Sequence, residues 1–389
     1  MKNILITGGA GFIGNALSKK LIAEGFYVTI LDNLSSKIHS DKSKYNSLKK
    51  ISNFIIGDVC SRKDWQAALK NQDAIIHLAA ETGTGQSMYE IYNYTHTNVG
   101  STALMMDVLA NNENQIKKII LSSSRAVYGE GKYLSDKNSF VYPKNRNLSN
   151  LKIGNFDFLS LNNEKLTAAP TDEDSIINPQ SVYSLTKFNQ EQILKLGCSS
   201  LNIQPVILRY QNVFGPGQSL SNPYTGILSI FSTRILNNND IEIYEDGLQT
   251  RDFVYIDDIV NVTYKSLVLN NLKHNIYNVG SGVPTTVISA AKKLKEIFKS
   301  NVNLEVSGRY RIGDIRNNFA DLTRLKSDFN YSNFISFDEG LKSFVDWVKT
   351  QKIQKDLYDD SIKELKNKGL IRWWRTFFYL YSFSLFQKI

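Results

Sequence analysis

The chain has 389 residues, of which 42% are hydrophobic and 21% charged, so it is long enough for one large domain or two coupled domains, and most of it should fold. Its formal net charge of +9 suits a nucleotide, an anionic membrane surface or nucleic acid, although the excess lysines are spread along the chain. Cys60 and Cys198 lie far apart, which excludes a disulfide framework or a cysteine metal site and fits a reducing cytoplasm.

The N-terminal segment predicts a strand, a glycine-rich turn, a helix and a second strand. The apolar residues 4–6 follow MKN directly, and we expect neither a signal peptide nor a membrane span. Glycines in the turn allow a tight bend, close approach of the backbone to a pyrophosphate, and close helix–strand packing; they are Gly8, Gly11 and Gly14. The helix N-terminus that follows would face the phosphates with its free N–H groups.

Asp32 ends the second predicted strand, VTILD, about 20 residues after the turn. A carboxylate at this place accepts hydrogen bonds from the adenosine ribose and repels a 2′-phosphate. No arginine follows it directly, so the segment predicts NAD rather than NADP as the cofactor.

Three further apolar runs alternate with helical segments, at residues 53–59, 73–80 and 117–129. The first contains Asp58, which we expect near the adenine, and the second ends in small residues that would let a cofactor lie close. This alternation predicts an α/β fold with a doubly wound parallel sheet and helices on both faces. Ligands should then bind beyond the carboxyl ends of the strands.

Tyr183 and Lys187 stand four residues apart in NPQSVYSLTKFNQE (178–191), so they would share one face of a helix. Taken alone, the pair has two interpretations. One is a solvated lysine beside a surface tyrosine. The other is a phenol whose pKa is lowered by a nearby positive charge, so that it acts as an acid or base.

These motifs together resemble the extended short-chain dehydrogenase/reductase family, in its branch of NAD-dependent nucleotide-sugar epimerases and dehydratases. The resemblance covers residues 1 to about 350 and rests on TGGAGFIG (7–14), GDV (57–59), HLAA (77–80), Asn98, SSSRAVYG (122–129), YSLTK (183–187), LRYQNVFGPGQ (208–218) and RDFVYIDD (251–258). It implies a Rossmann-type NAD-binding domain over 1–205. A smaller nucleotide-sugar-binding α/β region would follow over 206–350, with a return of the chain to the first domain around 250–280, and then an extension over 351–389.

The resemblance also implies the site residues. Ser124, Tyr183 and Lys187 would be catalytic: Lys187 and the nicotinamide ring would lower the pKa of Tyr183, and Ser124 would hold the sugar oxygen in line. The residues expected to bind NAD are Gly8, Gly11, Phe12, Ile13, Gly14, Asp32, Asn33, Asp58, Val59, Leu78, Ala79, Ala80, Asn98, Ser122, Tyr183, Lys187 and Tyr210. Those expected to bind substrate are Thr82, Ser87 and Ser124 at the sugar, Asn222 at the nucleotide, and Asn212, Arg251 and Arg311 at the diphosphate. We expect no metal.

Ala126 distinguishes the chemistries within this family. The family's 4,6-dehydratases carry Thr-Asp-Glu at positions 124–126, and its decarboxylating members keep a Glu at position 126. A methyl group cannot transfer a proton, so the resemblance favours a 4-epimerase that oxidises C4 with bound NAD and returns the hydride to the other face. The alternative is a 4-keto-sugar reductase or dehydrogenase. A non-catalytic RNA-binding relative is a remote alternative, because the Tyr–Lys pair is kept and no basic and aromatic repeat is present.

The expected substrate is a dTDP- or UDP-linked hexose. Residues 79–91, 209–228 and 243–258 resemble the substrate-binding region of dTDP-L-rhamnose 4-epimerase-like proteins, which favours a deoxyhexose and the synthesis of surface-polysaccharide precursors. The sequence leaves the nucleotide open, because dTDP and UDP differ by one methyl group and one hydroxyl. The two-helix interface common in the family implies a homodimer, and no nucleic-acid partner is expected.

Two segments depart from the family pattern. A polar insertion at 133–175 lies next to the expected active site and could be a lid, a subunit contact or a solvated excursion. The basic and aromatic segment 369–389 could anchor the protein at the inner face of the membrane, pack on a partner subunit, or be disordered.

Overall fold

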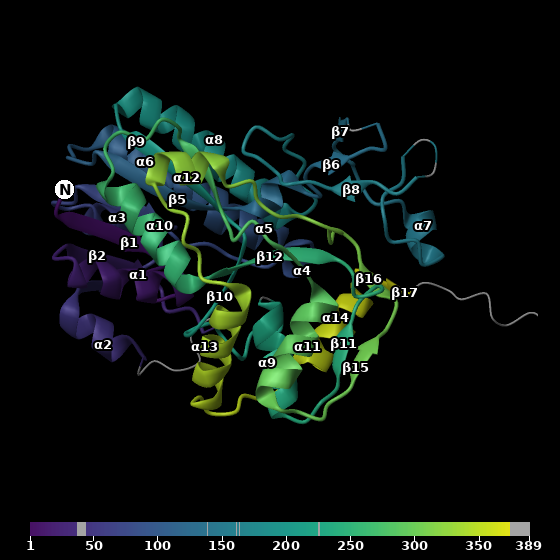
Figure 1. The fold of residues 1–389 in the computed structure, drawn as a ribbon. Coiled ribbons are helices and arrows are strands. Elements are labelled where there is room, and N and C mark those ends of the chain that lie inside the picture. The colour runs from purple at the N-terminus through teal and green to yellow at the C-terminus, as the bar shows by residue number, and fades with distance from the viewer. Residues whose placement is uncertain (37–43, 138, 161, 163, 225, 374–389) are drawn as a thin grey trace, which may run out of the picture.

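A parallel sheet of seven strands lies at the centre of the computed structural model, in the order β13-β9-β5-β4-β1-β2-β3 (Figure 1). The structure describes residues 1–36, 44–137, 139–160, 162, 164–224 and 226–373. The strands of this sheet are β1 (Asn3–Thr7), β2 (Tyr27–Asp32), β3 (Asn53–Ile56), β4 (Ala74–His77), β5 (Lys118–Ser124), β9 (Gln204–Tyr210) and β13 (Ile276–Val279). The predicted α/β fold with a parallel sheet is confirmed.

Helices cover both faces of the sheet, which explains why its strands are nearly continuous apolar runs. Side chains alternate between two hydrophobic clusters: Leu5 and Ile75 belong to one, and Ile4, Ile6 and Ile76 to the other. The first cluster contains residues of α3 (Arg62–Ala68), α6 (Ser101–Asn111) and α8 (Val182–Leu201). The second contains residues of α1 (Phe12–Ala23), α2 (Lys44–Ile51), α10 (Ile256–Val268) and α12 (Thr323–Phe329).

The chain leaves the sheet after β9 and returns to it once. The last two strands, β9 and β13, lie at one edge of the sheet, and α10 between them packs on its face. Residues after 205 therefore contribute to the central sheet, and the return lies within the range 250–280 where one was expected.

The remaining C-terminal elements form a smaller lobe beside the carboxyl ends of the strands (Figure 1). This lobe contains two small sheets. One consists of β10 (Asn212–Phe214), β12 (Thr250–Tyr255) and β14 (Pro284–Thr286), and the other of β11 (Ile241–Ile243) and β15 (Leu304–Val306). The helices of this lobe are α9 (Ile227–Leu236), α11 (Val287–Phe298) and α13 (Phe337–Lys349).

The insertion and the C-terminal extension are both built onto the chain's own fold. The insertion contains the antiparallel strands β6 (Tyr133–Leu134), β7 (Phe140–Val141) and β8 (Thr167–Ala168), with the helix α7 (Leu148–Lys152). The extension forms α14 (Tyr358–Asn367) and β17 (Ile371–Trp373), which pairs antiparallel with β16 (Arg309–Arg311). Residues 374–389 of the expected membrane or subunit contact lie outside the described residues. Within the described part of the chain, every helix is too short or too polar to cross a bilayer.

Candidate active site

A cavity of about 450 Å³ lies at the carboxyl ends of β1, β2, β4 and β5. It brings together most of the residues expected to bind NAD: Gly8, Gly11, Phe12, Ile13, Gly14, Asp32, Asn33, Val59, Leu78, Ala79, Ala80, Ser122, Tyr183, Lys187 and Tyr210. Four of the residues expected at the substrate also line it, namely Thr82, Ser124, Asn212 and Asn222. The cavity has the size of a small-molecule site.

The glycine turn leaves space that a side chain would fill. Gly8 has φ +67°, and a Cβ there would lie 2.8 Å from the backbone nitrogen of Ala79. A Cβ on Gly14 would lie 2.3 Å from the carbonyl oxygen of Gly8. Gly11 stands at the N-cap of α1 and has no side chain to cap the first-turn N–H groups. This cradle fits the pyrophosphate of a dinucleotide, because close backbone approach and free N–H groups occur together.

Asp32 lines the cavity in a fixed orientation. Its carboxylate accepts hydrogen bonds from the backbone N–H groups of Ala10, at 3.0 Å, and Leu34, at 2.9 Å. Asp58, by contrast, is not among the lining residues. Its carboxylate accepts a hydrogen bond from the side-chain amide of Asn33, a lining residue, at 3.1 Å.

The start of α8 places the two central catalytic candidates. Ser181 and Ser184 form a capping box that begins the helix, with Tyr183 in its first turn and Lys187 one turn later. The Nζ of Lys187 donates a hydrogen bond to the carbonyl oxygen of Ser122 at 2.8 Å. Ser124, the last residue of β5, lines the cavity with them. The surface-pair interpretation is excluded for Lys187, which is only 3% exposed.

Asn98 supports the site from behind. It is fully buried and lies in the π-helical turn Thr95–Gly100 that precedes α6. Its side-chain oxygen accepts the N–H of Glu81 at 2.8 Å, and its amide donates to the hydroxyl of Thr186 at 2.9 Å. Asn98 therefore joins the loop after β4 to α8 and does not line the cavity itself.

The surroundings of Tyr183 act on its pKa in both directions. Burial raises the pKa of Tyr183 above its ordinary value of 10, while a hydrogen bond with Ser124 and the charge of Arg125 lower it. Burial also lowers the pKa of Lys187 to about 8, against the opposing effect of Glu191. The effect that Lys187 and the nicotinamide ring are expected to have together on this pKa stays a prediction.

A buried ion pair lies beneath α8, and the sequence patterns did not predict it. Glu191 and Arg209 are joined by two hydrogen bonds, at 2.7 Å and 2.9 Å, and their side chains are 0% and 3% exposed. Glu191 also accepts a hydrogen bond from Ser123, the neighbour of Ser124. The pair connects α8, β5 and β9 and so holds the strand of Ser124 against the helix of Tyr183.

Three of the residues expected at the substrate do not line the cavity. Ser87 is fully buried and donates its hydroxyl hydrogen to the carbonyl oxygen of Thr84 at 2.7 Å, because the short helix α4 (Thr84–Ser87) turns it inward. Arg251 donates to the carbonyl oxygens of Thr250, at 2.7 Å, and Ile315, at 2.9 Å. Arg311 lies with its guanidinium 5.8 Å from the ring centroid of Tyr244. Residues that line the cavity without having been predicted include Thr84, Arg125 and Gln218.

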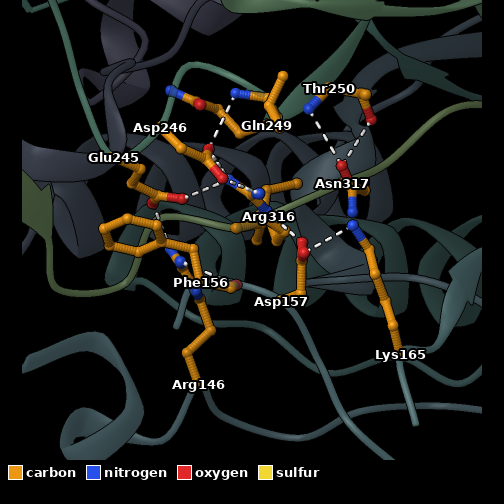
Figure 2. A network of polar contacts seen from close by, with 12 residues as sticks. Arg146, Phe156, Asp157, Lys165, Glu245, Asp246, Gln249, Thr250, Arg316 and Asn317 are labelled. Carbon is orange, nitrogen blue, oxygen red and sulfur yellow. Dashed lines mark hydrogen bonds and ion pairs between the residues drawn. The ribbon is translucent and has the colours of Figure 1, made fainter. Parts of the chain in front are cut away.

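The insertion is fastened to the C-terminal lobe by a buried network of charges (Figure 2). At its centre is Arg316, only 1% exposed, which bonds Asp157 of the insertion at 2.9 Å and Glu245 at 3.0 Å. Arg146 of the insertion bonds the same Glu245 at 2.5 Å. The carbonyl oxygen of Arg316 in turn accepts a hydrogen bond from Arg251 at 3.1 Å. These contacts exclude a solvated excursion and connect the insertion to Arg251.

Fold and site together define a nucleotide-binding α/β enzyme with a Ser–Tyr–Lys group at the cofactor cavity. The chain belongs to the NAD dependent epimerase/dehydratase family, whose model matches residues 4–147 and 162–280. The gap between the two matched ranges falls inside the insertion. The chain is thus an NAD-dependent enzyme, and the family resemblance of the sequence is confirmed.

Known relatives extend over nearly the whole chain. It is 35% identical over 358 residues to a dTDP-L-rhamnose 4-epimerase of Burkholderia thailandensis, covering 91% of this chain and 97% of that protein. It is 30% identical over 351 residues to a putative UDP-glucose 4-epimerase of Methanocaldococcus jannaschii, covering 89% and 98%. The solved structure of a UDP-glucose 4-epimerase with UDP-glucose from Thermotoga maritima has a TM-score of 0.72 at 28% identity, covering 89% of this chain and 98% of that one.

Proposed function

We propose that the chain is a nucleotide-sugar 4-epimerase that acts on a dTDP- or UDP-linked hexose, with dTDP-L-rhamnose favoured, in the synthesis of surface-polysaccharide precursors. One observation carries the proposal: Ser124, Tyr183 and Lys187 line the same cavity as the glycine turn, together with Ala126. The family resemblance implies an acid at position 126 in 4,6-dehydratases and decarboxylases, and this chain has a methyl group there. The name of the Burkholderia thailandensis relative supports the choice of sugar nucleotide.

The residues of the cavity have distinct tasks in this reaction. Bound NAD supplies a hydride acceptor for the sugar carbon. Tyr183 removes the proton from the C4 hydroxyl and returns a proton to that oxygen when C4 is reduced from the other face. Ser124 hydrogen-bonds the same oxygen and keeps it in line with the phenol, which is an effect of positioning. Gly8, Gly11 and Asp32 would hold the dinucleotide.

A panel of sugar nucleotides tests this function. The purified protein is incubated with dTDP-L-rhamnose, dTDP-glucose, UDP-glucose and UDP-galactose without added cofactor, and product stereochemistry is followed by NMR. Inversion at C4 with no net change in NADH is expected for at least one of them. Stoichiometric consumption of added NADH by a 4-keto sugar would instead identify a reductase. If no sugar nucleotide is inverted, the epimerase proposal is wrong.

A further inference from the structure

One wall of the cavity consists of β10 and the loop that follows it, with Asn212, Gln218 and Asn222 among the lining residues. The side-chain oxygens of Asn212 and Gln218 are buried and have no hydrogen-bond partner among the described residues. A buried acceptor without a partner costs free energy, so these two oxygens fit a ligand that brings its own donors. The hydroxyls of a ribose and the N–H of a pyrimidine base are donors of this kind.

The orientation of Asn222 in this wall depends on Tyr224. The side-chain oxygen of Asn222 accepts the backbone N–H of Tyr224 at 2.9 Å, two residues further along the loop. Asparagine commonly forms this local turn, which fixes its amide relative to the backbone. A movement of Tyr224 would therefore turn the amide that Asn222 presents to the cavity.

Tyr224 is in turn held by α14, near the C-terminal end of the chain. Its hydroxyl donates a hydrogen bond to the carboxylate of Glu364, 140 residues away in sequence. Its ring packs against the buried cluster that contains Tyr358, Ile362 and Leu365. A hydrogen bond to an ionised acceptor is about twice as strong as one between neutral groups. Glu364 thus fastens a loop of the cavity to the C-terminal extension.

The same helix supports a second wall of the cavity. Thr84 lines the cavity at the start of α4, and a Cβ on its neighbour Gly85 would lie 3.5 Å from the Cδ2 of Leu365. Tyr89, which follows α4, packs against the cluster of α14, and the ammonium group of Lys368 lies 5.4 Å from the centroid of its ring. Helix α14 therefore lies against both of the loops that the sequence linked to the substrate.

We propose that Glu364 is a positioning residue for the nucleotide: its bond to Tyr224 holds Asn222 in the orientation that a nucleoside diphosphate requires. This rests on the proposed function, in which Asn222 contacts the nucleotide of the substrate. Glu364 itself does not line the cavity, so it acts on binding and not on the chemistry at C4. Loss of the bond should raise KM for the sugar nucleotide while kcat and the bound NAD stay the same.

Nucleotide binding without turnover tests this role. The NAD-loaded full chain is titrated with UDP and with dTDP by calorimetry, as the native protein and as Tyr224→Phe, Glu364→Leu and Glu364→Gln. Loss of one hydrogen bond predicts a Kd about five- to tenfold higher for Tyr224→Phe and for Glu364→Leu. Glu364→Gln keeps an acceptor oxygen and should restore most of the affinity. The double variant of Tyr224→Phe and Glu364→Leu should bind as each single variant does, because both changes remove the same bond.

A matched control lies one turn earlier on α14. Asp360 is exposed, and Asp360→Leu should leave the Kd unchanged. Urea denaturation and the NAD content of each variant check that fold and cofactor site are intact, and Tyr224→Phe decides the matter if Glu364→Leu fails to fold. If the native chain binds UDP or dTDP and neither Tyr224→Phe nor Glu364→Leu changes the Kd, the role of Glu364 alone is overturned. If the native chain binds neither nucleotide, the proposed function is overturned with it.

Discussion

The Nζ of Lys187 lies 2.8 Å from the carbonyl oxygen of Ser122, so α8 is bonded through this lysine to the strand that ends in Ser124. Two residues along β5, Ser124 shares a hydrogen bond with Tyr183. The lysine and the tyrosine of one helix thus contact successive parts of one strand. This arrangement fixes the phenol relative to the serine.

Tyr183→Phe should abolish turnover and leave the cofactor bound. The substitution removes only the acid–base oxygen, and general acid–base catalysis contributes about 10²–10⁴-fold to rate. The measurements are kcat on the best sugar nucleotide and the NAD content of the purified protein. Loss of NAD together with activity would show that the variant damages the cavity, and a kcat within tenfold of the native chain would remove Tyr183 from the chemistry.

Glu191→Gln should strongly destabilise the protein. The change leaves Arg209 as a buried cation with a neutral partner, and breaking such a pair costs about 3–5 kcal/mol of unfolding free energy. Urea denaturation measures it. The matched control is Glu24→Gln, which breaks the exposed Lys20–Glu24 pair and should leave the unfolding free energy nearly unchanged. Equal effects of the two changes would contradict the assigned role of the buried pair.

Most of the residues that line one end of the cavity could be selected from the sequence, for physical reasons. The glycine turn, Asp32 and the Tyr183–Lys187 pair depend on local geometry: a tight bend, a strand end and one turn of helix. Each of these is a relation between residues close in the chain. The seven-stranded sheet followed from alternating apolar and helical segments.

Contacts between distant segments could not be predicted in the same way. The bonds of Arg316 to Asp157 and Glu245 join three segments, and nothing in any one of them indicates the other two. Arg251 was expected at the diphosphate, but its donors meet backbone carbonyls of Thr250 and Ile315.

Glu130 should make stability depend on pH. It is 2% exposed and accepts the N–H of Arg316 on both carboxylate oxygens, yet burial raises its pKa from 4.5 to about 7. The folded protein then binds this proton more tightly than the unfolded chain. Protonated Glu130 therefore contributes roughly 3 kcal/mol to the free energy of unfolding. This contribution is present in full below pH 4.5 and is lost as the pH rises to about 7.

Glu130→Gln isolates this effect. Between pH 5 and pH 8 the native chain should lose unfolding free energy relative to the variant. The reason is that at the higher pH only the native chain must bury a charged carboxylate. Urea denaturation at both pH values measures the difference. Tyr133, whose hydroxyl donates to Glu130 at 3.2 Å, is kept in both proteins. A difference that stays constant with pH would show that Glu130 titrates near its ordinary value.

Two truncations should separate the structural role of the C-terminal extension from membrane attachment. Deleting residues 369–389 removes β17, which leaves β16 without its antiparallel partner and uncovers Leu365 and Ile362, the buried residues that cluster with Ile371. Burying one such aliphatic side chain contributes about 1.5–3 kcal/mol, so this truncation should lower the unfolding free energy by at least about 2 kcal/mol. Deleting only 374–389 keeps β17 and should leave the unfolding free energy unchanged.

We expect that the shorter deletion is sufficient to abolish co-sedimentation with vesicles containing anionic lipid, because it removes Trp374 and Arg375 from the basic and aromatic segment. If the shorter variant still binds vesicles, or if the full chain does not bind them, the membrane role of the segment is wrong. Sedimentation velocity of the same two variants then shows whether the segment instead holds two subunits together.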